Sequence, residues 1–340
     1  MRIAIFCPGV TPPKNYGGTE RVVYWLGEAL TSLGHELIVI APPGSQLPFA
    51  KKVIELSLPQ GNINASQLEL EGLLKEAGED VDILHIHCAT PSSYNLPVLK
   101  TVHGYPFHYT GREEWACKEE FGEEYSFISK AHAATCGWPQ AAVVYNGLNP
   151  NEYIYSEKKS DYLLFLGKVD WNVKGLPFAL RLAREGKYPL KIAGVFMDKD
   201  FYKRELKPEI DKINFSGGNV EYVGPVAGQG KAQLLSQARA LVHFALWPEP
   251  FGLLIIEALV SGTPVLCTPN GAMPELMLQG ISGYMGRSFQ ETMGQVEMLK
   301  NISPQNCRKR VLENFTAKHM AEGYLKLYLN RIKSFARGCF

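Results

Sequence analysis

Two glutamates, Glu249 and Glu257, stand eight positions apart, separated by a Pro/Gly turn and an apolar run. A carboxylate inside an apolar helix costs free energy unless something hydrogen-bonds it, so Glu257 needs a partner. A ribose diol is a suitable one, as in dinucleotide-binding folds. Glu249 precedes the helix, where it can face the reactive end of a ligand. The alternative is that Glu257 caps a neighbouring loop and Glu249 is solvated, because short motifs produce many false positives.

The apolar run 253–260 predicts a buried helix that begins near Phe251 or Gly252, since the prolines just before it prevent an earlier start. A helix start offers N–H groups and partial positive charge to an anion such as a diphosphate. Gly252 has no Cβ, so a ligand can approach its backbone closely. Phe251, Gly252 and Leu253 are therefore candidate nucleotide contacts.

Two lysines flank a turn that follows a predicted strand at 162–166. Lys168 and Lys174 would lie near the carboxyl end of that strand, where two cations can neutralise a diphosphate leaving group. Lysines are commonly solvated, and that is the alternative for this pair.

The N-terminal half carries two further candidates. Gly17 and Gly18 join a loop to a helix predicted to start at Thr19 or Glu20. Paired glycines let backbone amides approach a phosphate, but a plain turn with Thr19 as N-cap explains the pattern equally well. His103 ends an apolar strand, where an imidazole can hydrogen-bond a sugar and stabilise developing charge, or can serve as a core histidine.

The elements that must position these residues alternate between strand and helix. Strands are predicted in both halves, and the candidate residues of the second half follow the carboxyl ends of strands, as in α/β proteins with parallel sheets. We therefore predict two Rossmann-like domains, at 1–150 and 156–315, joined by a polar linker at 147–155. An amphipathic helix within 316–340 ends the chain.

Composition excludes several classes of protein. The length of 340 residues suits two domains, and 46% hydrophobic with 20% charged residues is typical of a globular protein. A net charge of +1 gives no electrostatic case for nucleic acid. Seven cysteines without a CxxC pair favour reduced thiols and a cytoplasmic location over a zinc or redox motif. The sequence offers no signal peptide or transmembrane segment, so any weak contact with a membrane surface would use a surface helix.

The sequence resembles the retaining family-4 glycosyltransferases of the GT-B fold, also described as glycosyl transferases group 1. One segment of this chain is similar to the donor-site signature of that family, namely WPEPFGLLIIEALVSGTPVLCTPNGAMPEL. Four further segments follow the family's order, namely GGTERVVYWLGEAL, TVHG, VVYNGL and FLGKVDWNVKG. The resemblance therefore covers nearly the whole chain.

This resemblance implies an α/β fold in which two Rossmann-like domains with parallel sheets face a cleft, and the C-terminal helix 316–340 crosses back to the first domain. It implies a nucleotide-sugar co-substrate, expected to be a UDP-sugar, with no other cofactor and no bound metal. The second domain would bind this donor, and the acceptor-side first domain a hydroxyl acceptor.

The resemblance also assigns roles to single residues. Glu249 and His103 would bind the transferred sugar, and Glu257 would bind the ribose. Lys168 and Lys174 would bind the diphosphate. Gly17 and Gly18 would face the diphosphate from across the cleft. Family members usually carry Arg at the position of Lys168, which keeps the charge but lacks the bidentate fork. Two alternatives stay open: a GT-B nucleotide-sugar epimerase, and a non-catalytic sugar-nucleotide-binding protein, which would not need the full set of residues.

Overall fold

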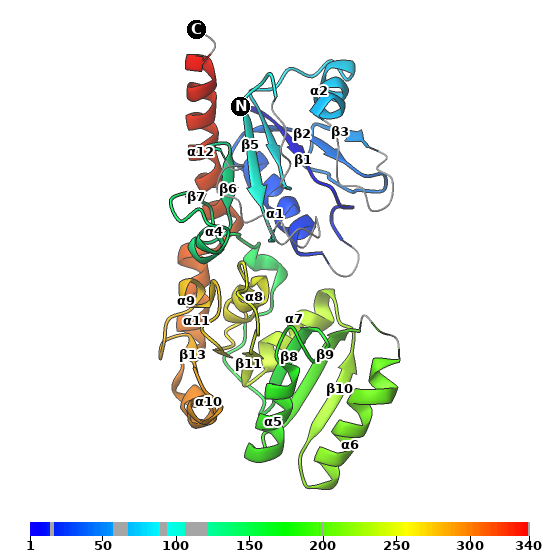
Figure 1. The fold of residues 1–340 in the computed structure, drawn as a ribbon, viewed down its shortest axis with the longest axis vertical. Helices are drawn as coiled ribbons and strands as arrows, with labels where there is room; N and C mark the ends of the chain where they lie inside the picture. Colours follow the sequence, from blue (N-terminus) through cyan, green and yellow to red (C-terminus); the bar gives the residue numbers. More distant parts are fainter. Residues whose placement is uncertain are drawn as a thin grey trace. The chain divides into compact units, whose positions relative to one another are not determined.

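The structure is a computed structural model, shown in Figure 1. It describes residues 1–13, 17–56, 67–88, 94–105, 122–196, 198 and 200–338. The chain divides into two compact units: unit 1 comprises Met1–Leu148 and Phe315–Phe340, and unit 2 comprises Asn149–Asn314.

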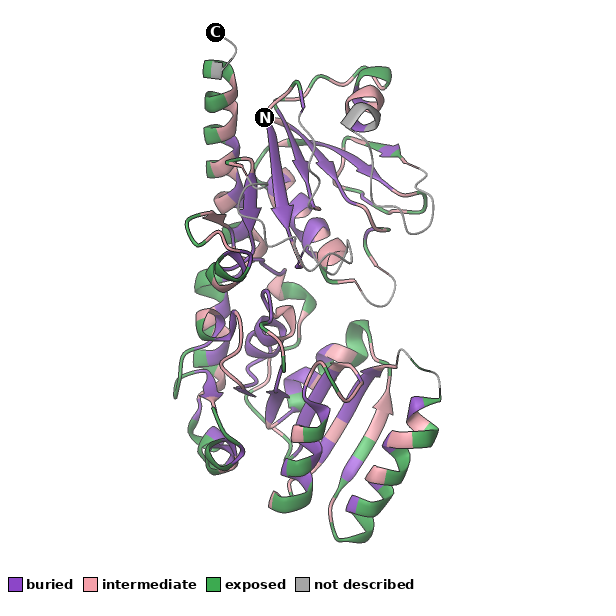
Figure 2. Cartoon of the chain, in the orientation of Figure 1, coloured by how far each residue is buried: buried purple, intermediate pink, exposed green. Residues whose placement is uncertain are grey.

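Unit 1 is built on a parallel sheet with the strand order β3-β2-β1-β4-β5-β6-β7. Its strands are β1 (Arg2–Phe6), β2 (Glu36–Ala41), β3 (Lys52–Glu55), β4 (Ile83–Ile86), β5 (Val98–Val102), β6 (Tyr125–Phe127) and β7 (Ala142–Val143). The central strands are apolar and almost wholly buried, as expected for parallel strands that helices cover on both faces, and Figure 2 shows them in the buried colour.

The described helices of unit 1 are α1 (Gly18–Ser32), α2 (Gln67–Glu76), α4 (Lys130–Thr135) and α12 (Ala317–Gly338). The C-terminal helix α12 packs against α1 and β5 within this unit. The start of α1 differs from the prediction, because Gly17 is the N-cap and no side chain caps the helix; Thr19 lies inside the first turn.

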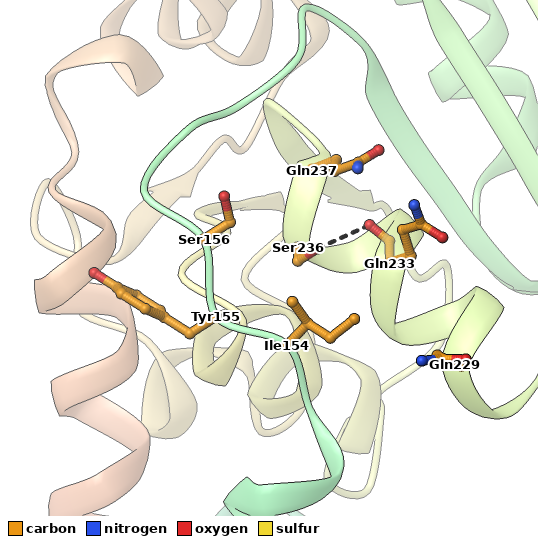
Figure 3. A pocket seen from close by; sticks show the side chains of 7 residues that line it. All are labelled: Ile154, Tyr155, Ser156, Gln229, Gln233, Ser236 and Gln237. Carbon is orange, nitrogen blue, oxygen red and sulfur yellow. Dashed lines mark hydrogen bonds between the residues drawn. The ribbon is translucent and has the colours of Figure 1, made fainter.

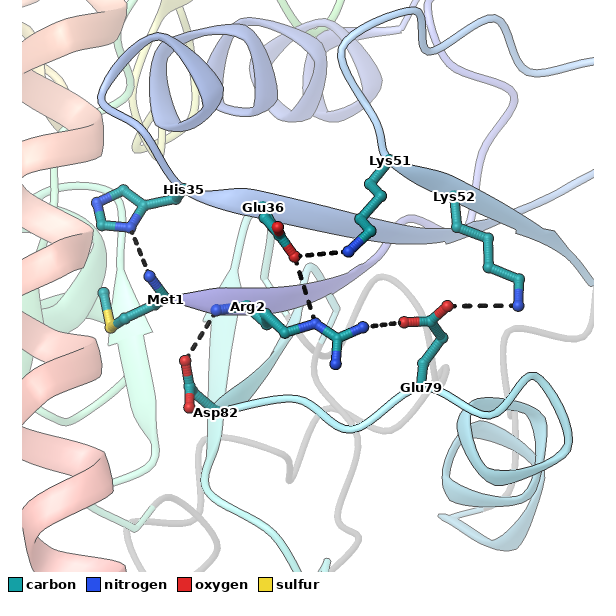
Figure 4. A network of polar contacts seen from close by, with 8 residues as sticks. All are labelled: Met1, Arg2, His35, Glu36, Lys51, Lys52, Glu79 and Asp82. Atoms are coloured by element: carbon teal, nitrogen blue, oxygen red, sulfur yellow. Dashed lines mark hydrogen bonds and ion pairs between the residues drawn. The ribbon is translucent and has the colours of Figure 1, made fainter.

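A network of charged side chains closes the edge of the unit 1 sheet where the strands begin (Figure 4). The Arg2 guanidinium lies 2.5 Å from Glu79 and 3.4 Å from Glu36, and each of these carboxylates also pairs with a lysine, Lys52 or Lys51. Most of these side chains are exposed, so each pair contributes little to stability. The network lies at the amino ends of the strands, opposite the edge where ligands bind in such folds.

Unit 2 is built on a second parallel sheet with the order β10-β9-β8-β11-β12-β13. Its strands are β8 (Leu163–Lys168), β9 (Leu190–Val195), β10 (Val220–Gly224), β11 (Ala240–His243), β12 (Val265–Cys267) and β13 (Gly283–Met285). Its α-helices are α5 (Leu176–Gly186), α6 (Lys207–Phe215), α7 (Gly228–Gln237), α8 (Leu253–Val260), α9 (Met273–Leu276), α10 (Phe289–Val296) and α11 (Pro304–Asn314). The predicted pair of parallel-sheet α/β units is confirmed.

The strand order of unit 2 reverses between β8 and β11. In open α/β sheets, ligands bind outside the carboxyl ends of the strands at such a switch point. The topology therefore predicts a ligand site at the loops that follow β8 and β11.

The loop after β8 ends at Gly175, the N-cap of α5, in the left-handed region at φ 73°. A Cβ atom there would lie 2.2 Å from the carbonyl oxygen of Phe244, in the segment that follows β11. Gly175 thus allows the two loops at the switch point to approach each other closely.

We predict that Gly175→Ala lowers the free energy of unfolding by roughly 2–4 kcal/mol, because it combines left-handed backbone strain with a clash against backbone. Urea unfolding would measure the loss. The matched control is Gly224→Ala, also at positive φ (89°) but facing open space, which should cost only about 1 kcal/mol. Equal losses in the two variants would contradict the close approach.

Candidate functional site

The candidate residues of unit 2 gather where three neighbouring strands end. Strand β11 pairs with β8 on one side and β12 on the other, so their carboxyl ends share one edge of the sheet. Lys168 is the last residue of β8, and His243 is the last residue of β11. Lys174 and Glu249 lie in the loops that follow these two strands.

Lys174 and Glu249 form a largely buried ion pair. The Lys174 Nζ atom lies 2.5 Å from Glu249 Oε2, and their side chains are only 15% and 12% exposed. The Nζ atom also lies 5.5 Å from the centre of the Trp247 ring, a cation–π contact. The sequence predicted both residues for one site, but not that they would pair with each other.

The His243 imidazole is the second neighbour of the Glu249 carboxylate. Its Nε2 atom lies 3.6 Å from Glu249 Oε2, just beyond hydrogen-bond distance. Burial raises the pKa of Glu249, but the adjacent His243 and Lys174 outweigh this effect and bring the pKa down to about 2. Glu249 is therefore a buried carboxylate that stays ionised at neutral pH.

The backbone of Glu249 is held by the loop that follows β12. Gly271 packs so closely that a Cβ atom there would lie 2.2 Å from the Glu249 carbonyl oxygen, and the amide of Ala272 donates a hydrogen bond to that oxygen at 2.9 Å. The Asn270 side chain donates to the carbonyl of Ala245 at 2.7 Å. Two loops from adjacent strands thus fix the position of the carboxylate.

Lys168 is more exposed than Lys174. Its ammonium lies 3.3 Å from Asp170, and its side chain is 36% exposed. Asp170 also accepts hydrogen bonds from the amides of Asn172 and Val173, which shapes the turn between the two lysines. Lys168 can therefore reach solvent or a ligand, whereas Lys174 faces Glu249.

Helix α8 begins as predicted, with Gly252 as its N-cap and Leu253 as its first residue. The cap has no side-chain hydrogen bond, and Phe251 is buried just before it. The first turn therefore carries the partial positive charge of a helix start without an acidic side chain.

Glu257 is buried in α8 at 2% exposure. The Tyr153 hydroxyl donates to its Oε1 at 2.8 Å, and the Lys231 ammonium lies 2.5 Å from its Oε2. The carboxylate therefore has partners within the protein before any ligand binds. Sequence reasoning missed both partners, because Tyr153 lies in the predicted linker and Lys231 in α7, far from Glu257 along the chain.

A cavity of about 470 Å³ lies between α7 and the segment 154–156 (Figure 3). The described residues that line it are uncharged: Ile154, Tyr155, Ser156, Gln229, Gln233, Ser236 and Gln237. The predicted site residues are not among them. The cavity offers hydrogen-bonding groups but no charge for a diphosphate.

In unit 1, His103 follows β5 and meets a second histidine. Its Nε2 atom lies 2.9 Å from Nδ1 of His87. Burial, with a smaller contribution from His132, lowers the pKa of His103 to about 3. His103 is thus a neutral imidazole at physiological pH, able to exchange hydrogen bonds but not to supply a positive charge. His85 hydrogen-bonds Tyr328 and Thr101 in the core of the unit.

Gly17 and Gly18 lie at the start of α1, where Glu20 also sits. A Cβ atom on Gly17 would lie 2.6 Å from Glu20 Oε2, and one on Gly9 would lie 2.3 Å from Glu20 Oε1. A carboxylate therefore already occupies this helix start. Glu20 would have to move for a diphosphate to bind at Gly17 and Gly18, so that role stays a prediction.

Two features are absent from the described residues. Within the part of the chain that the structure describes, no three His, Cys, Asp or Glu side chains are arranged to hold a metal ion. Likewise, among the described helices none is both long and apolar enough to cross a membrane.

Several curated proteins are similar to the chain over most of its length. It is 20% identical to O-antigen chain mannosyltransferase C of Escherichia coli, covering 95% of this chain and 96% of that protein. It is 22% identical to N-acetyl-alpha-D-glucosaminyl L-malate synthase of Bacillus anthracis, covering 97% and 98%. It is 23% identical to phosphatidyl-myo-inositol mannosyltransferase of Mycolicibacterium smegmatis, covering 84% and 80%.

Solved structures share the fold. The glycosyltransferase AviGT4, involved in avilamycin A biosynthesis, superposes with a TM-score of 0.71 at 23% identity, covering 98% of both chains. HepE of Anabaena, in complex with UDP and glucose, gives a TM-score of 0.67 at 16% identity, covering 96% of this chain and 98% of HepE. The fold of both units is thus the GT-B fold of glycosyltransferases.

Two family models match consecutive parts of the chain. The family described as Glycosyltransferase Family 4 matches residues 16–137, and Glycosyl transferases group 1 matches residues 153–311. These two ranges take in most of both units and every predicted site residue. The chain therefore belongs to the family-4 glycosyltransferases of the GT-B fold.

Proposed function

We propose that this glycosyltransferase moves a sugar from a UDP-sugar to a hydroxyl acceptor, with retention of configuration and without a bound metal. The observation that carries the proposal is the ionised Glu249 beside Lys174 at the switch point of the unit 2 sheet. An anion and a cation fixed side by side match the two charges of the reaction, since positive charge develops on the sugar and negative charge on the leaving diphosphate.

Each group takes one part in this proposal. Lys174, Lys168 and the start of α8 neutralise the diphosphate as it leaves. Glu249 holds the sugar hydroxyls and favours the oxocarbenium-like state. In this proposal the acceptor attacks from the front face with the leaving phosphate as its base, and Glu249 forms no covalent glycosyl–enzyme intermediate.

The choice of UDP as nucleotide rests on the structural relative HepE, which was crystallised with UDP and with UDP-glucose. The relatives named as mannosyltransferases leave the sugar open. The roles of unit 1 in acceptor binding and of His103 at the sugar stay predictions.

Donor choice is tested by thermal unfolding with UDP-, GDP- and ADP-sugars, since a ligand that binds only the folded state raises the melting temperature. Proton NMR of the products then follows the anomeric configuration of the transferred or hydrolysed sugar. Retention supports the proposal and inversion contradicts it. An epimerised sugar would identify the nucleotide-sugar epimerase, and binding without turnover with any acceptor would identify the non-catalytic protein.

Glu249→Gln should reduce turnover by roughly 10²–10³-fold, because it removes the negative charge that stabilises the transition state. The Kd for UDP should change by less than about threefold, since UDP lacks the sugar that Glu249 contacts. Donor hydrolysis and calorimetry measure the two effects. The matched control is Glu221→Gln on β10, where Glu221 forms an ion pair with Lys191 of β9, and it should change neither. If UDP binding weakens as much as turnover, the assignment to the sugar is wrong.

Glu257→Ala should weaken UDP binding by about 1.5–3 kcal/mol, as expected for the loss of a charged hydrogen bond to the ribose. The wild-type preference for UDP over 2′-deoxy-UDP should shrink in the variant, which a purely structural defect would not cause. Tyr153→Phe removes one protein partner of Glu257 without removing the carboxylate, and should keep the preference. An unchanged UDP affinity in a folded Glu257→Ala protein would exclude the ribose contact.

Chelation with EDTA should leave transferase activity within about twofold of the untreated enzyme, because lysines and a helix start take the place that Mg²⁺ has in other phosphate sites. The measurement is the initial rate before and after dialysis against EDTA. Loss of activity that Mn²⁺ or Mg²⁺ restores would show that the diphosphate site is wrongly assigned.

A further inference from the structure

The proposed donor site contains a conflict between Lys174 and Glu249. The proposed reaction assigns Lys174 to the diphosphate and Glu249 to the sugar, yet the two side chains are bound to each other 2.5 Å apart and are mostly buried. If Lys174 moved toward a phosphate, its contact with the Glu249 carboxylate would weaken. A poorly solvated carboxylate without a close partner costs free energy. A second partner for Glu249 would resolve the conflict.

His243 is suited to be that partner. It ends the buried strand β11, and its side chain is only 4% exposed. Its Nε2 atom is buried and has no hydrogen-bond partner, which is unusual for a buried polar atom and requires an explanation. The same atom lies 3.6 Å from Glu249 Oε2, the oxygen that Lys174 binds.

We infer that His243 is a positioning residue that takes over Oε2 of Glu249 when the donor diphosphate draws Lys174 away. The inference rests on the proposed function of Lys174 and Glu249. The imidazole, with its proton on Nε2, needs to approach by less than about 1 Å to reach hydrogen-bond distance. No proton is transferred, so Glu249 stays ionised and keeps its orientation toward the sugar while Lys174 serves the phosphate.

The exchange of partners predicts that both catalysis and UDP binding depend on the hydrogen bond from His243. His243→Leu cannot donate to Glu249 and should lower kcat for donor hydrolysis by roughly 10- to 100-fold, the range expected for a hydrogen bond to a charged group. Its Kd for UDP should also rise, by up to a similar factor, because binding of the diphosphate then leaves the Glu249 carboxylate without a donor. His243→Gln can place an amide N–H near the position of Nε2, and should recover most of the lost kcat.

A spectroscopic test does not depend on these variants folding. In the full-length protein with ¹⁵N-labelled histidine, saturating UDP should shift the His243 Nε2 signals to values typical of a hydrogen-bonded imidazole. In Lys174→Met, which removes the competing cation, the same signals should have these values without UDP. His132 in unit 1, whose buried Nδ1 also lacks a partner, is the internal control and should not respond.

The outcomes separate the inference from the proposed function. If Lys174→Met binds UDP as tightly as the wild type, the proposed diphosphate site is wrong. If UDP binding depends on Lys174 but the His243 signals respond neither to UDP nor to Lys174→Met, the inference is overturned and the proposed function stands. Unchanged kcat in a folded His243→Leu protein would also overturn it.

Discussion

The buried ion pair between Lys174 and Glu249 is the constraint around which unit 2 is organised. A carboxylate at 12% exposure is costly to ionise without a cation or a hydrogen-bond donor beside it, and Lys174 can be that cation only where the loops after β8 and β11 meet. Gly175 permits this approach from one side, and Gly271 presses the loop after β12 against the Glu249 backbone from the other. The loops after three adjacent strands thus position one ion pair.

The second carboxylate of the motif has a different environment. Glu257 lies deeper, within α8, and both its oxygens are bound, one by Tyr153 and one by Lys231. A carboxylate held in this way can orient a ligand, but it has little freedom to move as charge develops on the ligand during a reaction. Glu249 sits in a loop and contacts Lys174, the lysine that the proposal assigns to the leaving diphosphate. The two glutamates therefore have different surroundings, which is consistent with the two roles proposed for them.

Sequence reasoning predicted the parts of the fold that depend on local pattern. The apolar runs of β9 and α8 and the special residues after β8 and β11 were recognisable because burial and turn chemistry leave marks along the chain. The three-residue strand β13 was not predicted, because GYM is too short to show a pattern. Three neighbours of the carboxylates were not predicted: Lys231, Tyr153 and His243. Only the tertiary fold brings them close to the carboxylates, and their spacing along the sequence does not indicate this.

The charged groups of the two units are consistent with the proposal that unit 2 binds the diphosphate. In unit 1, burial keeps His103 neutral, and the helix start at Gly17 is already occupied by the carboxylate of Glu20. Neither group offers positive charge to an anion. In unit 2, Lys168, Lys174 and the start of α8 gather at one edge of the sheet. A neutral imidazole is better suited to an uncharged hydroxyl than to a phosphate, so His103 fits a contact with sugar or acceptor. In the proposed reaction the neutralisation of the leaving group therefore falls to unit 2, and Glu249 then needs a second partner when Lys174 binds the phosphate.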